Sequence, residues 1–167
     1  MSSLAMPTET ELLIRLDDLS DPRIAAFMEE HLQDMRATSP PESVHALDMN
    51  KLRQPDIAFW TAWLNEPAGP MLAATAAIKR LDEEHAELKS MRTAAALRGR
   101  GLARRMLRHV LTEARQRGYR RLSLETGTQA FFEPAHQLYA SEGFVVCGPF
   151  GSYQLDPHSC YMTLALA

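Results

Sequence analysis

The chain has 167 residues, of which 46% are hydrophobic and 23% are charged, and its formal net charge at pH 7 is -3. This length and composition predict one globular domain over residues 1–167, with residues 1–10 as a flexible N-terminal extension. The slight acidic excess argues against a nucleic-acid-binding protein. We expect a cytoplasmic protein, because we find no signal peptide, no stretch long enough to span a membrane, and no disulfide or metal spacing between the two cysteines.

The first half of the chain alternates between strand and helix patterns. Residues 12–16 predict a short strand, and residues 21–38 predict a helix that ends before a double proline. The apolar stripe of this helix is expected to consist of Ile24, Phe27, Met28, Leu32 and Met35. A second, short helix is expected over residues 43–51, with a serine as its cap. The next expected elements are strands at 57–64, 71–80 and 86–93, separated by turns at 65–70 and 81–85.

The clearest helical pattern covers residues 101–117, where apolar side chains recur on one helix face. The buried stripe is expected to consist of Leu102, Met106, Leu107, Val110, Leu111 and Ala114. A strand at 120–126, a helix at 131–142 and strands at 144–148 and 159–166 follow. The whole order, β-α-α-β-β-β-α-β-α-β-β, predicts an α/β fold of the mixed, α+β type, with a central sheet and helices on both faces.

The stretch RGRGLA, residues 98–103, lies just before and within the start of this helix and is rich in glycine and arginine. Backbone N–H groups at a helix N-terminus bind anions, and small residues let a phosphate come close. The N-terminus of a helix carries partial positive charge, so each exposed arginine there destabilises the helix by about 0.3–1 kcal/mol. A bound polyanion would make the same arginines stabilising. The stretch is not a Walker A loop. A dinucleotide-binding motif would need glycine or alanine in place of Arg104 and an immediate turn after the strand.

Two short motifs occur in order on the expected elements. Residues 98–103 fit R-x-x-G-x-A, and residues 135–144, AHQLYASEGF, fit A-x-x-L-Y followed by G-F. With these motifs the sequence resembles the GNAT superfamily of acetyl-coenzyme A-dependent N-acetyltransferases over about residues 57–166. The resemblance implies a GNAT-like fold and an enzyme that takes acetyl-CoA as co-substrate. The histidines are scattered and show no ligand spacing, so we expect no metal site.

The resemblance also implies which residues contact the coenzyme. Backbone N–H groups of residues 91–93 would hold the pantetheine and polarise the thioester carbonyl, and residues 98–103 would bind the pyrophosphate. The expected contact residues are Met91, Arg92, Thr93, Arg98, Gly99, Arg100, Gly101, Leu102, Ala103, Arg104, Phe132 and His136. Arg104 or Arg105 could reach the 3′-phosphate, or both could belong to a solvated face.

Acetyl transfer requires that the amine lose a proton and that the departing thiolate gain one. Tyr139 matches the tyrosine that lies near the sulfur in many GNAT enzymes, so it is the expected acid; otherwise it is a core residue. His136, on the same helix face, is a second candidate acid or a lining residue, and we favour lining. Glu87 is the expected base, acting through water; otherwise it is a surface residue paired with a nearby lysine. Glu125 and water alone are the remaining alternatives for the base.

The acceptor is expected to bind at residues 31–48, HLQDMRATSPPESVHALD. The candidate residues are Arg36, Ser39, Ser43 and His45, unless the double proline only reverses the chain. The predicted partners are acetyl-CoA and a primary amine of a small molecule, such as an amino acid. The alternatives are a protein N-terminus or lysine as acceptor, and a non-catalytic domain that senses acyl-CoA. A homodimer is compatible with the superfamily, but no sequence feature indicates one.

Overall fold

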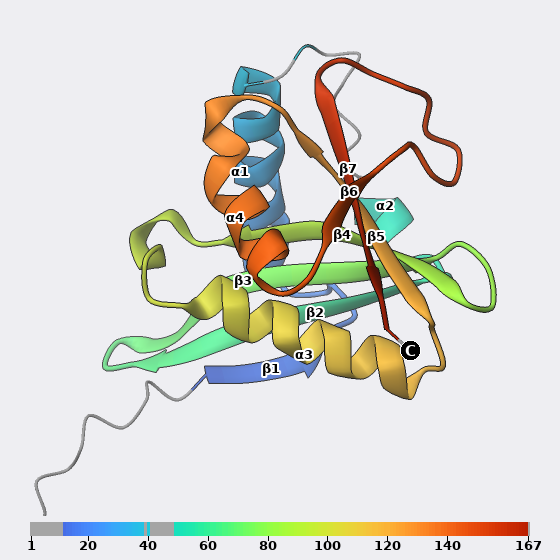
Figure 1. Cartoon of the computed structure of the whole chain (residues 1–167). Coiled ribbons are helices and arrows are strands. Elements are labelled where there is room, and N and C mark those ends of the chain that lie inside the picture. Colours follow the sequence, from blue (N-terminus) through green and yellow to red (C-terminus); the bar gives the residue numbers. More distant parts are fainter. Residues whose placement is uncertain (1–11, 39, 41–48, 167) are drawn as a thin grey trace, which may run out of the picture.

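The computed structural model describes residues 12–38, 40 and 49–166 of the chain. Within these ranges the strands form one seven-stranded sheet in the order β1-β2-β3-β4-β5-β7-β6 (Figure 1). Their bounds are β1 Leu12–Leu16, β2 Ile57–Glu66, β3 Gly69–Arg80, β4 His85–Thr93, β5 Arg121–Gly127, β6 Val145–Cys147 and β7 Ser159–Ala165. Strands β4 and β5 pair in parallel and the other neighbours pair antiparallel, which confirms the predicted mixed sheet.

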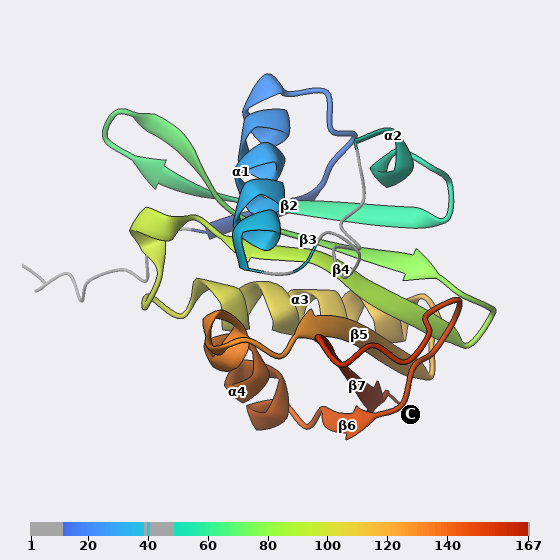
Figure 2. The same cartoon turned by 90° about the horizontal axis from the view of Figure 1, so that it is seen from above.

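Helices cover both sides of the sheet, as predicted. Helices α1 (Pro22–Thr38) and α2 (Met49–Leu52) lie on one side, and α3 (Leu102–Gln116) and α4 (Glu133–Ser141) lie on the other (Figure 2). The predicted apolar stripe of α3 is confirmed, because all six of its residues are buried against the sheet. Within the described ranges, no helix is long and apolar enough to cross a membrane.

Two predicted boundaries are wrong, and a third is only partly described. The expected turn at 65–70 is shorter, because Asn65 pairs with Pro70 and Glu66 with Gly69 at the end of a tight hairpin. The expected helix at 131–142 begins as a 3-10 turn at Ala130–Phe132, and the α-helix starts only at Glu133. The short helix expected at 43–51 is described only as α2, which extends to Leu52; the rest of that prediction lies outside the described residues.

Two irregularities of β4 create space in the middle of the sheet. Thr75 of β3 pairs with Arg92 and Ala77 pairs with Lys89, so Ser90 and Met91 form a bulge opposite one β3 residue. Ser90 has φ +53°, a left-handed conformation that is uncommon for a residue other than glycine. On the other edge, β4 pairs with β5 only as far as Leu88, opposite Leu124. Beyond these residues the two parallel strands separate.

Candidate active site

Two cavities meet where β4 and β5 separate. The larger cavity, which we call the α3–α4 groove, has a volume of about 530 Å³ and lies between the end of β4, the loop before α3 and helix α4. The smaller one, the inner cavity, has a volume of about 110 Å³ and lies among α1, β4, β5 and the loop between β6 and β7. Residues that line both cavities are His31, Met35, Met91, Phe132, Ala135 and Tyr139.

The loop before α3 needs glycine at two positions. Gly99 has φ +84° and Gly101, the N-cap residue of α3, has φ +76°, so both adopt the left-handed conformation. No side chain of the described part caps this end of the helix, and the first turn carries no acidic residue. The first backbone N–H groups of α3 are therefore available to an anion in the α3–α4 groove.

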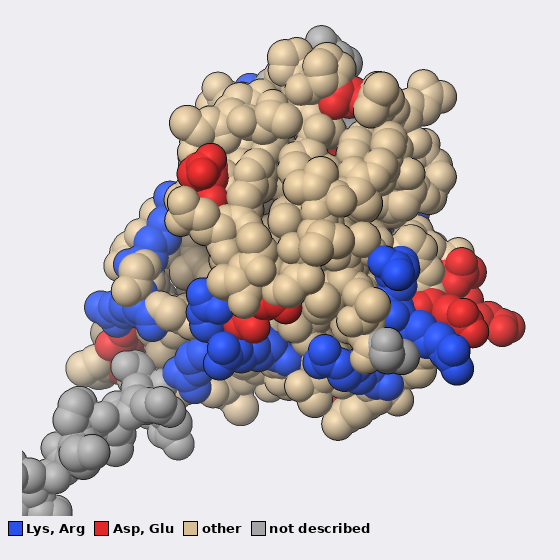
Figure 3. Space-filling view, viewed as in Figure 1, with Lys and Arg blue, Asp and Glu red and all other residues tan. Residues whose placement is uncertain are grey.

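Arginine side chains place positive charge beside this groove. Figure 3 shows Lys and Arg side chains gathered in a band along α3. Arg104 crosses from α3 to α4, where its Nη1 donates to Ser141 Oγ and to Glu142 Oε1, each at 2.9 Å. Arg108 donates to the same Oε1 at 2.7 Å, and this bond, together with that from Arg104, lowers the pKa of Glu142. Arg104 is thus an ion-paired part of the groove wall.

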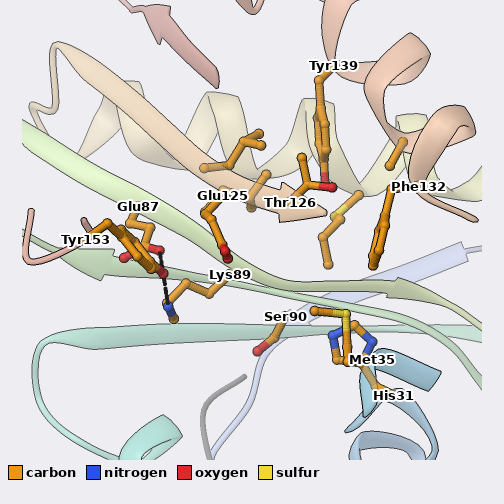
Figure 4. Close-up of a pocket in the computed structure, with 14 residues that line it drawn as sticks. His31, Met35, Glu87, Lys89, Ser90, Glu125, Thr126, Phe132, Tyr139 and Tyr153 are labelled. Carbon is orange, nitrogen blue, oxygen red and sulfur yellow. Dashed lines mark hydrogen bonds and ion pairs between the residues drawn. The ribbon is translucent and has the colours of Figure 1, made fainter. Parts of the chain in front are cut away.

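A buried carboxylate lies at one end of the inner cavity. Glu87 is 4% exposed, and its Oε2 accepts hydrogen bonds from the Tyr153 hydroxyl at 2.5 Å and from Lys89 Nζ at 3.1 Å (Figure 4). Lys89 also donates to the Tyr153 hydroxyl at 3.0 Å. Burial and the charge of Glu87 raise the pKa of Tyr153, so its hydroxyl keeps its proton. Glu87 is therefore paired with a lysine, but it is not the surface residue that the alternative interpretation expected.

A second carboxylate, Glu125 of β5, faces the same cavity. Its Oε2 accepts a hydrogen bond from Ser159 Oγ at 2.7 Å. The charge of Glu125 also contributes to the raised pKa of Tyr153, so both carboxylates act on this hydroxyl. The lining of the cavity thus carries two carboxylates and the single ammonium group of Lys89 among its described residues. This balance is negative and favours an amine over an anion as the ligand.

Two polar side chains stand at the junction of the cavities. Tyr139 of α4 is 6% exposed and packs against Phe144, with ring centroids 5.6 Å apart. Burial raises the pKa of its hydroxyl. His31 of α1 approaches from the opposite wall (Figure 4). Burial and the charge of Arg92 lower the pKa of His31 to about 4, so its imidazole is neutral near pH 7.

Arg92 holds α1 against β4. Its Nη1 lies 2.6 Å from Asp34 Oδ2, its Nη2 lies 3.8 Å from Glu30 Oε2, and its guanidinium carbon lies 5.5 Å from the ring centroid of Phe27. Its buried Nε has no hydrogen-bond partner within the described ranges. These contacts bind the turn of α1 that carries His31 to the strand that borders both cavities.

Residues 24–144 match the family model described as the Acetyltransferase (GNAT) family. The chain belongs to this family. It is 50% identical over 153 residues to the uncharacterized N-acetyltransferase YsnE of Bacillus subtilis (strain 168), covering 92% of this chain and 99% of YsnE. It is also 50% identical over 153 residues to the uncharacterized N-acetyltransferase YedL of Escherichia coli (strain K12), covering 92% and 94% of the two chains. A Klebsiella pneumoniae structure described as an acyl-CoA N-acyltransferase has the same fold, with a TM-score of 0.74, 24% identity and coverage of 95% and 99%.

Membership of the GNAT family makes the protein an acyltransferase that uses acetyl-CoA as the donor. The residues predicted to contact the coenzyme line the α3–α4 groove, except for Arg100 and His136. Arg100 instead lies on the exposed surface, 4.0 Å from Glu66. His136 Nε2 lies 2.8 Å from the carbonyl oxygen of Gly127 and 3.3 Å from Thr126 Oγ1, so its ring ties α4 to the end of β5. The side chains of α4 that line the groove are instead Pro134, Ala135, Leu138 and Tyr139.

The acceptor residues predicted for this GNAT protein are only partly described. Arg36 is exposed on α1 and lines neither cavity, while Ser39, Ser43 and His45 lie outside the described residues. Helix α1 contributes His31 and Met35 to both cavities instead.

Sequence reasoning missed three side chains that line the inner cavity. It included His31 in the expected acceptor segment at 31–48 without naming it as a candidate, assigned Met35 to the core and did not single out Tyr153. The four-residue spacing of His31 and Met35, which puts both on one helix face, was the available signal for the first two. Among the described residues, no cluster of histidine, cysteine and carboxylate side chains could hold a metal ion.

Proposed function

We propose that this protein transfers the acetyl group of acetyl-CoA to a primary amine of a small molecule by direct attack of the amine on the thioester. The observation that carries the proposal is the junction beside Tyr139. There, a groove with open helix N–H groups meets a small cavity lined by two carboxylates. The groove is suited to a polyanionic coenzyme, and the cavity is suited to an amine.

The coenzyme would lie along the groove with its acyl end at the junction. The pyrophosphate would bind the N–H groups at the start of α3, and the pantetheine would follow residues 91–93 at the end of β4. The edge of β4 that faces β5 has no ladder partner beyond Leu88. Backbone groups on that edge are thus available to the pantetheine amides and to the thioester carbonyl oxygen.

The chemistry needs one proton to leave the amine and one to reach the sulfur. The C–N bond forms, the C–S bond breaks, and the products are an amide and the free thiol of CoA. Tyr139 is the proposed acid, since its buried hydroxyl keeps its proton and lines the junction. Glu87 is the proposed base acting through water, and Glu125 is the alternative, because both carboxylates line the cavity from which the amine would approach.

The dimensions of the inner cavity support a small acceptor. Its volume of about 110 Å³ suits a metabolite better than a polypeptide segment, and Tyr153 from the β6–β7 loop lies against its far end. A cytoplasmic location is part of the proposal, since the cysteines of the described part, Cys147 and Cys160, are both free thiols, as expected in a reducing compartment.

Thermal melting with acetyl-CoA, CoA, NAD and ATP tests the coenzyme part of the proposal. A ligand at about 100 times its Kd adds about 2.7 kcal/mol, so each CoA compound should raise the Tm by roughly 5–11 °C. A shift with NAD alone would refute the coenzyme part.

A screen of small amines and peptides, followed by thiol release, then tests the acceptor. Tyr139→Phe should keep the melting shift and lose about 10²-fold or more in rate. Activity with peptides alone would indicate a protein acetyltransferase, and coenzyme binding with no active acceptor would indicate a sensor.

A further inference from the structure

The junction of the two cavities contains a polar group that lies outside both GNAT motifs. Most residues that line both cavities are apolar, and the polar exceptions are Tyr139 and His31. Tyr139 reaches the junction from α4, whereas His31 reaches it from α1, and the two side chains face each other across the space (Figure 4). An amine that attacks a thioester at this point must therefore pass beside His31.

The ring of His31 is free to bind a ligand. Two other histidine rings already have hydrogen-bond partners, because His136 contacts the Gly127 carbonyl oxygen and His85 contacts Ser123 Oγ at 2.7 Å. No hydrogen bond to the His31 ring occurs among the residues that the structure describes, and its nitrogens are not among the buried, unpartnered atoms. Because this half-buried ring lines both cavities, its nitrogens can form hydrogen bonds with a ligand in either cavity.

The groups around His31 keep its imidazole neutral and hold its helix turn in position. Arg92 faces it from β4, Asp34 and Glu30 share its helix, and burial together with Arg92 disfavours the imidazolium. A neutral imidazole has one nitrogen with a lone pair that accepts a hydrogen bond. The ion pair between Arg92 and Asp34 fixes the helix turn from which His31 projects.

On the basis of the proposed function, we propose that His31 accepts a hydrogen bond from the attacking nitrogen of the acceptor and orients its lone pair toward the thioester carbon. His31 takes up no proton in this role. The nitrogen forms its bond to carbon as the bond to sulfur breaks. One proton leaves the nitrogen toward the carboxylate side, and one reaches the sulfur from Tyr139. The carboxylates Glu87 and Glu125 then act on the acceptor from the inner cavity, while His31 sets the angle of attack at the junction.

A pair of coenzyme thioethers tests this role without knowledge of the natural acceptor. S-(N-methylcarbamoylmethyl)-CoA carries an amide N–H next to the carbonyl group, in the region where the acceptor nitrogen would bind. S-(methoxycarbonylmethyl)-CoA has the same shape with an ester oxygen in place of that N–H. Titration calorimetry of both probes, and of CoA itself, is carried out with the full-length wild type, with His31→Phe and with Met35→Leu. Met35→Leu is the matched control, because Met35 lines the same two cavities one helix turn away.

We expect the wild type and Met35→Leu to bind the amide probe about three- to tenfold more tightly than the ester, the usual effect of one hydrogen bond. His31→Phe should remove this preference, and titration with CoA itself measures separately any effect of the larger ring on the groove. Equal amide-to-ester ratios in the wild type and in His31→Phe would overturn the inference while leaving the proposed function intact. Failure of the wild type to bind CoA would overturn both.

A second measurement guards against a variant that does not fold. His31→Leu replaces His31→Phe if the larger ring is not tolerated. In addition, the wild type labelled with ¹⁵N-histidine is titrated with both probes, and the imidazole signal of His31 is assigned with the variant that folds. The amide probe should shift that signal and the ester should not. An identical response to both probes would overturn the inference.

Discussion

Gly127→Ala is the substitution whose effect can be worked out most directly from the structure. An added β-carbon would overlap Cε2 of Phe132 and would lie 2.5 Å from its Cδ2 and 2.6 Å from Gln129 Oε1. These separations are far below van der Waals contact, so the Phe132 ring must move. That ring is buried, stacks edge-on against Phe131 with centroids 5.0 Å apart, and lines both cavities. The substitution therefore acts on stability and on the α3–α4 groove together.

The expected destabilisation follows from two opposing effects. Overpacking a buried site costs about 1–3 kcal/mol. Replacing glycine by alanine restricts the unfolded chain and returns about 0.4–1 kcal/mol, since Gly127 does not have the positive φ that alanine disfavours. The net loss is about 1–2 kcal/mol, which corresponds to a fall in Tm of about 2–8 °C for a chain of this size. The affinity for acetyl-CoA should also fall, because the displaced ring enters the groove.

The assay compares urea unfolding and acetyl-CoA titration for Gly127→Ala and for Gly148→Ala. Gly148 is the matched control, since its β-carbon would meet nothing within 4 Å and its φ is also not positive. Adding Phe132→Leu to Gly127→Ala should recover part of the lost stability, so the two effects should not add. Wild-type stability and wild-type affinity in Gly127→Ala would refute the reasoning, because the ring would then have room that the structure denies it.

Four further predictions rest on single contacts. Gly101→Ala, at a left-handed position, should destabilise the protein by about 1–2 kcal/mol in urea unfolding and weaken acetyl-CoA binding. Tyr153→Phe removes a hydrogen bond to a buried carboxylate and should cost about 1.5–3 kcal/mol by the same measurement. Because the pKa of His31 falls from its usual 6.5 to about 4 on folding, protonation of this ring does not reduce the free energy of unfolding above pH 6.5. As the pH falls toward 4, the unfolded chain takes up a proton at His31 that the folded protein does not. The free energy of unfolding of the wild type should therefore fall by about 1–2 kcal/mol more than that of His31→Phe between pH 7 and pH 5. Arg98→Ala, in the groove, should weaken CoA binding measured by calorimetry more than Arg100→Ala, outside it.

Local patterns in the sequence predicted the elements and the groove. The apolar stripe of α3 repeats with the helical period, and any helix with that stripe must bury it, so all its members could be identified. The conformation of the loop before α3 could also be predicted, since glycines just before an amphipathic helix indicate a left-handed backbone that depends only on local residues. The α1 stripe was accurate only in part. Ile24, Phe27 and Met28 are buried, but Met35 is half-exposed because the last turns of α1 border a cavity instead of a core.

The inner cavity depends on contacts that no local pattern encodes. Glu87 and Tyr153 are 66 residues apart, and their hydrogen bond forms only because the β6–β7 loop folds back over β4. One of the two sequence interpretations of Glu87 placed it on an exposed strand surface beside a lysine, and that interpretation would hold for an uncovered sheet. Here Tyr153 of the β6–β7 loop lies over this part of β4, so the carboxylate is buried and must be paired. The distinction between a surface ion pair and a buried one therefore required the tertiary structure.

The arginines around the start of α3 do not all have the same explanation, although the sequence argument treated them together. Positive charge at a helix N-terminus is unfavourable without a compensating anion, and the sequence interpretation assigned that anion to the coenzyme. For Arg104 the protein itself supplies the anion, because Glu142 accepts its hydrogen bond, so its presence does not require a ligand. Arg98 lines the groove and has no ion pair among the described residues. The electrostatic argument for a bound polyanion therefore rests on Arg98 and on the open N–H groups of α3, and the stability of the free protein alone does not explain either of them.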